Sequence, residues 1–132
     1  MYIARLPQRR TLRVVAMGRI LIVCEDKPFR TSLAKTLAKE GYDVEAVEGL
    51  ERESAGKRLA AFDLVIWDVG TAAGGEVRRL RQLGARCQRL LVISTVGDGA
   101  WDGQTGVWTE AQYLQRPVKR DVLLHKVREL MS

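Results

Sequence analysis

The sequence is poor in the residues that form disulfide frameworks and zinc sites. Among 132 residues there are two cysteines, Cys24 and Cys87, and one histidine, His125. Two separated cysteines are too few for a disulfide scaffold, and neither has the clustered cysteine and histidine neighbours of a zinc site. Because free thiols suit a reducing compartment, we expect a cytoplasmic protein.

Long apolar runs are also missing. No apolar stretch approaches the roughly 20 residues that a membrane-spanning helix needs. Residues 1–16 alternate arginines with apolar residues and lack the continuous apolar segment of a signal peptide. We therefore expect neither secretion nor a membrane partner. The hydrophobic content of 46% and charged content of 29% are those of a folded globular domain.

The net charge of +6 lies mostly at the start of the chain. Residues 1–19 contain no acidic residue and five basic ones, Arg5, Arg9, Arg10, Arg13 and Arg19. A basic arm can bind nucleic acid, but short basic termini are more often solvated tails, so nucleic-acid binding is only a minor hypothesis. We expect a flexible basic extension over residues 1–16, or a second start at Met17, and one domain over residues 17–132.

Apolar, strand-like segments alternate with segments of helical period through this domain. The predicted strands lie at residues 20–24, 42–47, 64–67, 90–93 and near 113–114. The predicted helices lie at residues 28–40, 50–60, 77–83 and 123–131, the second weakened by glycines. Such alternation predicts an α/β fold, with a parallel five-stranded sheet and helices on both faces.

The segment between the fourth and fifth strands departs from this alternation. Gly97, Gly99, Gly103 and Gly106 fall within ten residues, and each glycine costs a helix about 1 kcal/mol relative to alanine. We expect a loop or short turn over residues 96–109. Its tryptophans, Trp101 and Trp108, would then cover core surface or serve as interface anchors.

Polar residues follow the predicted strands where each strand ends, and they meet at one edge of a parallel sheet. These residues are Glu25, Asp26, Asp68, Ser94, Thr95 and Arg116. Glu25 or Asp26 with Asp68 would supply oxygen ligands to Mg²⁺. Asp68 could accept a phosphoryl group, which the Ser94 hydroxyl and the Arg116 guanidinium would bind.

Four segments in this order, ILIVCED, DLVIWD, LLVIST and YLQRP, resemble the receiver domains of bacterial two-component response regulators. The resemblance covers residues 18–132. It implies a flavodoxin-like fold with Asp68 as the phosphoacceptor. It also implies that Glu25 and Asp68 bind Mg²⁺, with Asp26 and the Gly70 backbone carbonyl as further candidate ligands.

The same resemblance assigns a switch and partners. Ser94 matches the switch hydroxyl, Tyr113 the switch aromatic, and Arg116 with Pro117 the family's Lys-Pro pair. A signalling module of this kind, rather than an enzyme, would receive its phosphoryl group from a sensor histidine kinase or a phosphotransfer protein. It would signal to an output protein, or to a second copy of itself, through the face of residues 96–131.

The departures from the family are chemical. Cys24 stands where an acid is usual, Glu25 replaces a shorter aspartate, Thr95 replaces a smaller residue, and Arg116 replaces lysine. Fewer carboxylates predict weak Mg²⁺ binding that depends on Asp68 and Glu25. The alternative function is a phosphate-independent receiver that acts as a binding or dimerisation module.

Simpler structural roles remain open for the same residues. Asp68 could cap the turn after its strand, Asp26 could cap the first helix, and Cys24 could be an inert buried thiol rather than a redox sensor. His125 has no ligand partners and suits a surface or packing position. An α/β enzyme with a nucleotide ligand lacks support, because no glycine-rich phosphate-binding motif follows any strand.

A shortened chain beginning at Met17 should fold like the full chain, because residues 1–16 add neither an element nor a core pattern. We expect closely similar thermal midpoints for the two chains in circular dichroism. A fall of more than about 10 °C would mean that the arm contributes several kcal/mol, which contradicts the tail interpretation.

Overall fold

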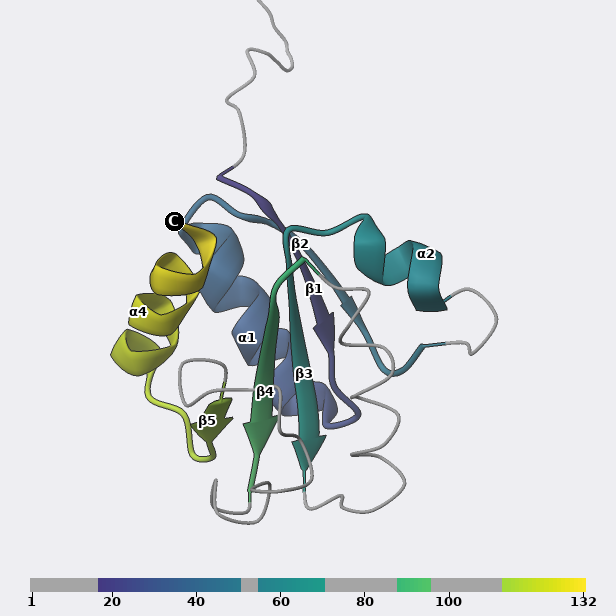
Figure 1. Cartoon of the computed structure of the whole chain (residues 1–132). Helices are drawn as coiled ribbons and strands as arrows, with labels where there is room; N and C mark the ends of the chain where they lie inside the picture. Colours follow the sequence, from purple (N-terminus) through teal and green to yellow (C-terminus); the bar gives the residue numbers. More distant parts are fainter. Residues whose placement is uncertain (1–16, 51–54, 71–87, 96–112) are drawn as a thin grey trace, which may run out of the picture.

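The computed structural model describes residues 17–50, 55–70, 88–95 and 113–132 (Figure 1). These residues form one parallel sheet with helices on both of its faces, as the sequence predicted. The predicted helix over residues 77–83 and the glycine-rich segment with Trp101 and Trp108 lie outside the described residues. Among the described helices, none combines the length and the apolar character needed to cross a bilayer.

The five strands lie in the order β2-β1-β3-β4-β5, and every neighbouring pair is parallel. They are β1 (Arg19–Val23), β2 (Asp43–Val47), β3 (Leu64–Gly70), β4 (Leu90–Ser94) and β5 (Tyr113–Gln115). The runs of apolar residues in β1, β3 and β4 are buried, which is typical of strands covered on both faces. The order places β3 at the centre, so its carboxyl end lies between those of β1 and β4.

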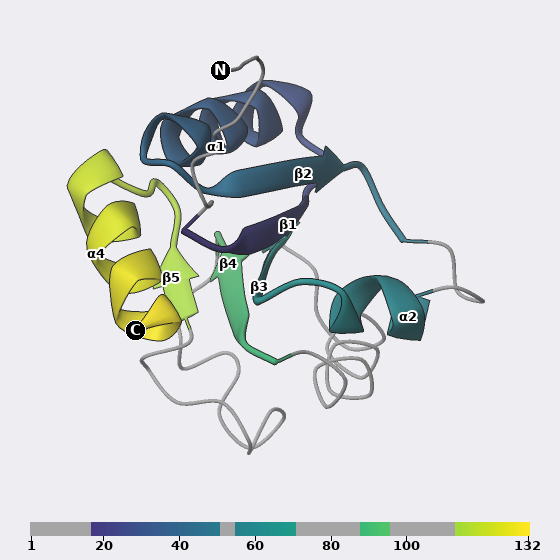
Figure 2. The same ribbon diagram turned by 90° about the horizontal axis from the view of Figure 1, so that it is seen from above.

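Helices cover both sides of this sheet (Figure 2), and a hydrophobic cluster fills the space on each side. The helices α1 (Lys27–Lys39) and α4 (Arg120–Met131) cover one side, where Leu37 and Val127 pack with the strand residue Ile66. The short helix α2 (Ala55–Ala60) contributes Leu59 to the other side. Alternate residues of each strand therefore enter different clusters, as the two-residue period of a strand requires.

Helix α1 begins where the sequence places a cap and a proline. The Asp26 Oδ1 atom accepts a hydrogen bond from the Phe29 backbone N–H at 3.2 Å, and Pro28 lies in the first turn, where its missing N–H costs nothing. The helix-capping role considered for Asp26 is thus confirmed. After the helix, Gly41 adopts a positive φ of 100°, a conformation that favours glycine.

Strand β3 differs from the prediction at its carboxyl end. The sequence predicted that it ends abruptly at Asp68, but it continues to Gly70, with a register shift between Asp68 and Gly70. The extension exists because the Gly70 carbonyl accepts a hydrogen bond from the Thr95 backbone N–H at 2.9 Å. Asp68 is therefore held inside the sheet and not in a free loop.

Replacing Leu37 by alanine should lower the free energy of unfolding by about 2–5 kcal/mol, because Leu37 is fully buried between α1 and the sheet. Urea titration followed by the fluorescence of the buried Trp67 measures this loss. The matched control is Lys35→Ala on the exposed side of α1, which should stay within about 0.5 kcal/mol of the parent chain. Equal effects of the two substitutions would contradict the packing of α1.

Candidate functional site

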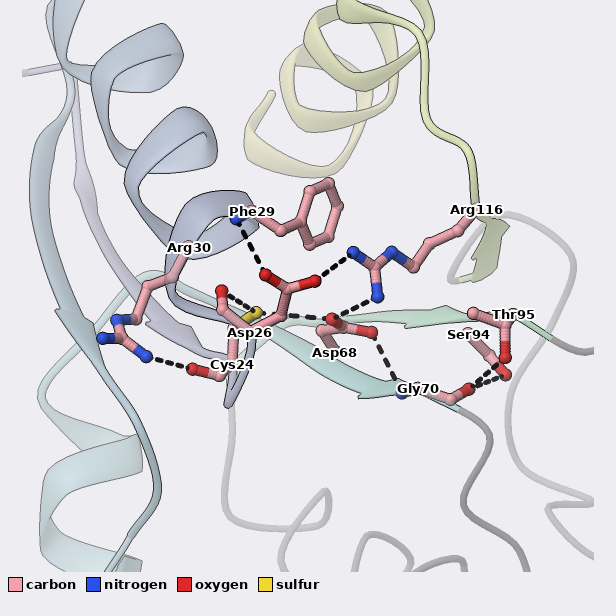
Figure 3. A network of polar contacts seen from close by, with 9 residues as sticks. All are labelled: Cys24, Asp26, Phe29, Arg30, Asp68, Gly70, Ser94, Thr95 and Arg116. Carbon is pink, nitrogen blue, oxygen red and sulfur yellow. Dashed lines mark hydrogen bonds and ion pairs between the residues drawn. The ribbon is translucent and has the colours of Figure 1, made fainter.

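The Asp68 carboxylate lies at the carboxyl end of the central strand and is almost wholly enclosed, with its side chain 4% exposed (Figure 3). Its Oδ1 atom accepts a hydrogen bond from the Gly70 backbone N–H at 3.0 Å. Its Oδ2 atom lies 3.3 Å from the Cys24 thiol sulfur and 3.5 Å from Arg116 Nη1. Both oxygens of this buried carboxylate therefore have donors, which is what keeps a buried anion tolerable.

The Arg116 guanidinium lies between two carboxylates from different parts of the chain (Figure 3). Its Nη2 atom donates to Asp26 Oδ2 at 2.8 Å, while Nη1 faces Asp68. The ring of Phe29 lies under the guanidinium, 4.1 Å from its central carbon, in the geometry of a cation–π contact. The Arg116 backbone N–H donates to the Ser94 carbonyl at 2.8 Å, so both the backbone and the side chain of this arginine are held.

These contacts shift the titration of both partners in the closer pair. The hydrogen bond from Arg116, followed by that from the Phe29 backbone, lowers the pKa of Asp26 below its ordinary value. The same hydrogen bond with Asp26 raises the pKa of Arg116. Both groups are therefore charged at neutral pH, and the bridge is an ion pair.

Cys24 follows β1 and is buried beside Asp68. Its thiol donates to Asp68 Oδ2 and lies 3.4 Å from the Asp26 backbone carbonyl. Burial, reinforced by the hydrogen bond to Asp68, raises the pKa of Cys24 to about 12. The thiol is therefore neutral at physiological pH, and the structure supports the buried-residue interpretation over a reactive thiolate.

Ser94, Thr95 and Gly70 form a second part of the site. The Ser94 and Thr95 hydroxyls both donate to the Gly70 carbonyl, at 2.9 and 3.0 Å. Gly70 has a φ of 59°, in the left-handed region that favours glycine. Because a hydroxyl has only one proton, Ser94 gives it here to Gly70, and binding a phosphoryl group would require that hydroxyl to turn. Tyr113, the predicted switch aromatic, is half-buried in β5 and packs against the cluster on the α2 side.

The predicted Mg²⁺ ligands do not assemble into a metal site in this arrangement. Glu25 is exposed, and within the described parts of the chain no group of three or more His, Cys, Asp or Glu residues is placed to hold a metal ion. Asp26 and Asp68 share Arg116, and the Gly70 carbonyl accepts three hydrogen bonds. A hard divalent cation does not fit these donors as they lie, and Mg²⁺ binding through Glu25 and Asp68 stays a prediction.

Two residues that position the site were not predicted as site residues. Phe29 lay within the predicted helix over residues 28–40 and was given no role in the site, yet its ring supports the Arg116 guanidinium. Arg30 donates through Nη1 to the Cys24 carbonyl at 2.7 Å and so ties α1 to the end of β1. The sequence did contain a signal for both residues, because Phe29 and Arg30 lie in the first helical turn after the acid Asp26. That turn faces the carboxyl edge of the sheet, where the site lies. His125 is exposed on α4, in agreement with the surface position considered for it.

Solved structures provide the comparison, because no family model and no curated protein matches the sequence. A protein from Burkholderia pseudomallei described as pilus assembly-related matches with a TM-score of 0.72 and 19% identity, over 92% of this chain and 94% of that one. A chemotaxis response regulator of Vibrio cholerae matches with a TM-score of 0.68 and 21% identity, over 87% of this chain and 99% of its own.

A response regulator from Thermotoga maritima also matches, with a TM-score of 0.64 and 22% identity over 86% of this chain and 96% of that one. Together with the strand order, these likenesses confirm the predicted flavodoxin-like architecture. At identities this low, they concern the fold and not the chemistry of the site. The chain therefore has the fold of response-regulator receiver domains.

Proposed function

We propose that this chain is a receiver module of two-component signalling and that Asp68 accepts a phosphoryl group from a sensor histidine kinase or a phosphotransfer protein. The observation that carries the proposal is the position of Asp68. It is the acid at the carboxyl end of the central strand, with the Arg116 guanidinium at 3.5 Å and the Gly70 N–H at 3.0 Å. Open α/β sheets bind their ligands at this edge. A phosphoryl donor such as a sensor histidine kinase fits a cytoplasmic location of this chain.

The surroundings of Asp68 suit an acyl phosphate. One carboxylate oxygen would form the bond to phosphorus while the leaving group of the donor departs with its bonding electrons. The product would add negative charge beside Arg116, and charge-assisted hydrogen bonds would stabilise it. The Ser94 and Thr95 hydroxyls lie at the neighbouring Gly70 carbonyl, and they would exchange their hydrogen bonds to this carbonyl for bonds to the phosphoryl oxygens.

The route from this site to a partner passes through Arg116. This residue directly follows β5 and precedes Pro117 and α4, so a change in its ion pairs would act on the connection between these two elements. We place the output face over residues 96–131, of which residues 113–131 are described. On α4, the side chain of Val122 is 47% exposed and would be available for contact with an output protein or a second copy.

A second candidate is a phosphate-independent receiver that serves as a binding or dimerisation module. The observation that favours it is the enclosure of Asp68, whose two oxygens are already satisfied by Gly70, Cys24 and Arg116. A phosphoryl donor reaches this carboxylate only after Arg116 or Cys24 moves. The two candidates share the fold and the output face, and they differ in whether Asp68 reacts.

Incubation with acetyl phosphate should add one phosphoryl mass to the parent chain and none to Asp68→Asn, because Asp68 is the acid at the carboxyl end of the central strand. Intact-mass spectrometry at neutral pH, with Mg²⁺ and separately with EDTA, measures this. The matched control is Asp43→Asn, which removes an exposed acid of β2 and should be labelled like the parent.

Labelling of Asp68→Asn would show that another residue is the acceptor. If neither the parent chain nor the Asp43→Asn control is labelled, the phosphate-independent receiver is the correct candidate. Labelling that is equal with Mg²⁺ and with EDTA would show that Asp68 reacts without a divalent cation.

A further inference from the structure

We infer that Arg116 is the resident cation of the Asp68 site and that its guanidinium occupies the place between the Asp26 and Asp68 carboxylates that a divalent metal ion would need. The inference concerns how the site is neutralised. It stands whether or not Asp68 accepts a phosphoryl group. It predicts that metal ions compete with a side chain of the protein itself.

The first argument is that every carboxylate oxygen of the pair already has a hydrogen-bond donor or an ion-pair partner. In Asp26, Oδ1 accepts from the Phe29 N–H and Oδ2 from Arg116 Nη2. In Asp68, Oδ1 accepts from the Gly70 N–H, and Oδ2 faces the Cys24 thiol and Arg116 Nη1. A divalent ion that binds two of these oxygens must therefore displace donors, and among the described residues Arg116 is the one donor that contacts both carboxylates.

The second argument is that the remaining ligands do not suit a hard cation. Mg²⁺ requires about six oxygens in near-octahedral geometry at about 2.0–2.1 Å. The Gly70 carbonyl already accepts hydrogen bonds from the Ser94 hydroxyl, the Thr95 hydroxyl and the Thr95 N–H. Beside Asp68, Cys24 offers a sulfur atom, a soft donor that suits Mg²⁺ poorly.

The third argument is that Arg116 is held in place and does not sample solvent freely. Its side chain is 23% exposed, against 59% for Arg128, which pairs with Glu40 on the surface. The Phe29 ring lies under the guanidinium, and the Arg116 backbone N–H donates a hydrogen bond to the Ser94 carbonyl. An arginine fixed in this way loses little further freedom when it pairs with a carboxylate.

The fourth argument is the charge balance. Asp26 and Asp68 bring two negative charges, and Arg116 brings one positive charge between them. A second guanidinium, that of Arg30, donates to the Cys24 carbonyl and adds a weaker favourable charge at Asp26. Side chains of the protein itself therefore supply positive charge to this pair of carboxylates.

The inference is tested by removing the guanidinium while keeping a long apolar side chain. Arg116→Met should bind Mg²⁺ at least about tenfold more tightly than the parent chain, because the two carboxylates lose the cation that they share. Titration followed by Trp67 fluorescence measures the affinity, and the rise of the thermal midpoint with added Mg²⁺ measures it independently. In the double variant Arg116→Met with Asp68→Asn, the gain should disappear.

The control is Arg128→Met, which removes an exposed, ion-paired arginine of α4 and should leave Mg²⁺ affinity unchanged. Equal affinities of Arg116→Met and the parent chain would overturn the inference, and so would an equal gain in Arg128→Met. If Arg116→Met does not fold, the inference is tested by NMR spectra of the isotopically labelled parent chain with added Mn²⁺. Selective broadening of the Cys24 and Gly70 amide signals at stoichiometric Mn²⁺ would refute a resident guanidinium, whereas unbroadened signals support it.

Discussion

The pairing of β3 between β1 and β4 is the constraint on which the whole site depends. The register aligns Val23 of β1 with Trp67 of β3, and Asp68 with Ile93 of β4. The residues that follow these positions, Cys24 and Ser94, therefore reach the same edge as Asp68. Because these strands are buried on both faces, a register slip of one residue would exchange the residues of the two hydrophobic clusters as well as dispersing these groups. Core packing and site geometry are thus fixed by the same contacts.

Arg116 joins two parts of the molecule that the sheet alone would leave independent. It follows the edge strand β5, yet its guanidinium reaches Asp26 at the start of α1, 90 residues away in the sequence. The ion pair between Arg116 and Asp68 is largely enclosed. A pair of buried charges stabilises the fold only if the remaining carboxylate oxygens also have hydrogen-bond donors. Here the backbone N–H groups of Phe29 and Gly70 satisfy them. The local folding of α1 and β3 therefore makes the long-range ion pairs tolerable.

Sequence reasoning recovered the elements that local patterns determine. The apolar runs predicted the strands. Asp26 and Pro28 predicted where α1 begins, including the cap by Asp26. It also placed Asp68, Ser94 and Arg116 at one edge, because that follows from the topology alone. It could not predict that β3 continues to Gly70, since the extension depends on a hydrogen bond from Thr95, a residue of another segment.

The pairing of side chains within the site could not be predicted from the sequence, for a related reason. Six acidic, basic and hydroxyl side chains at one edge can pair in several ways, and spacing along the chain does not choose among them. The resemblance favoured Glu25 as the partner of Asp68, whereas the structure brings the Asp68 carboxylate into contact with Cys24 and Arg116 and leaves Glu25 exposed. The choice depends on burial, because the enclosed edge admits a neutral thiol and a shared guanidinium at lower cost than a further carboxylate.

A tethered cation has different consequences from a bound ion. The occupancy of a metal site follows the concentration of the free metal, so the charge at such a site changes with solution conditions. The guanidinium of Arg116 is part of the chain, and its charge persists at every physiological pH. A movement of β5 or of its connection to α4 would shift the guanidinium relative to Asp26 and Asp68. The charge around Asp68 is thereby coupled to the conformation of the same segment that we assign to the output face, and a divalent ion reaches the two carboxylates only in competition with this guanidinium.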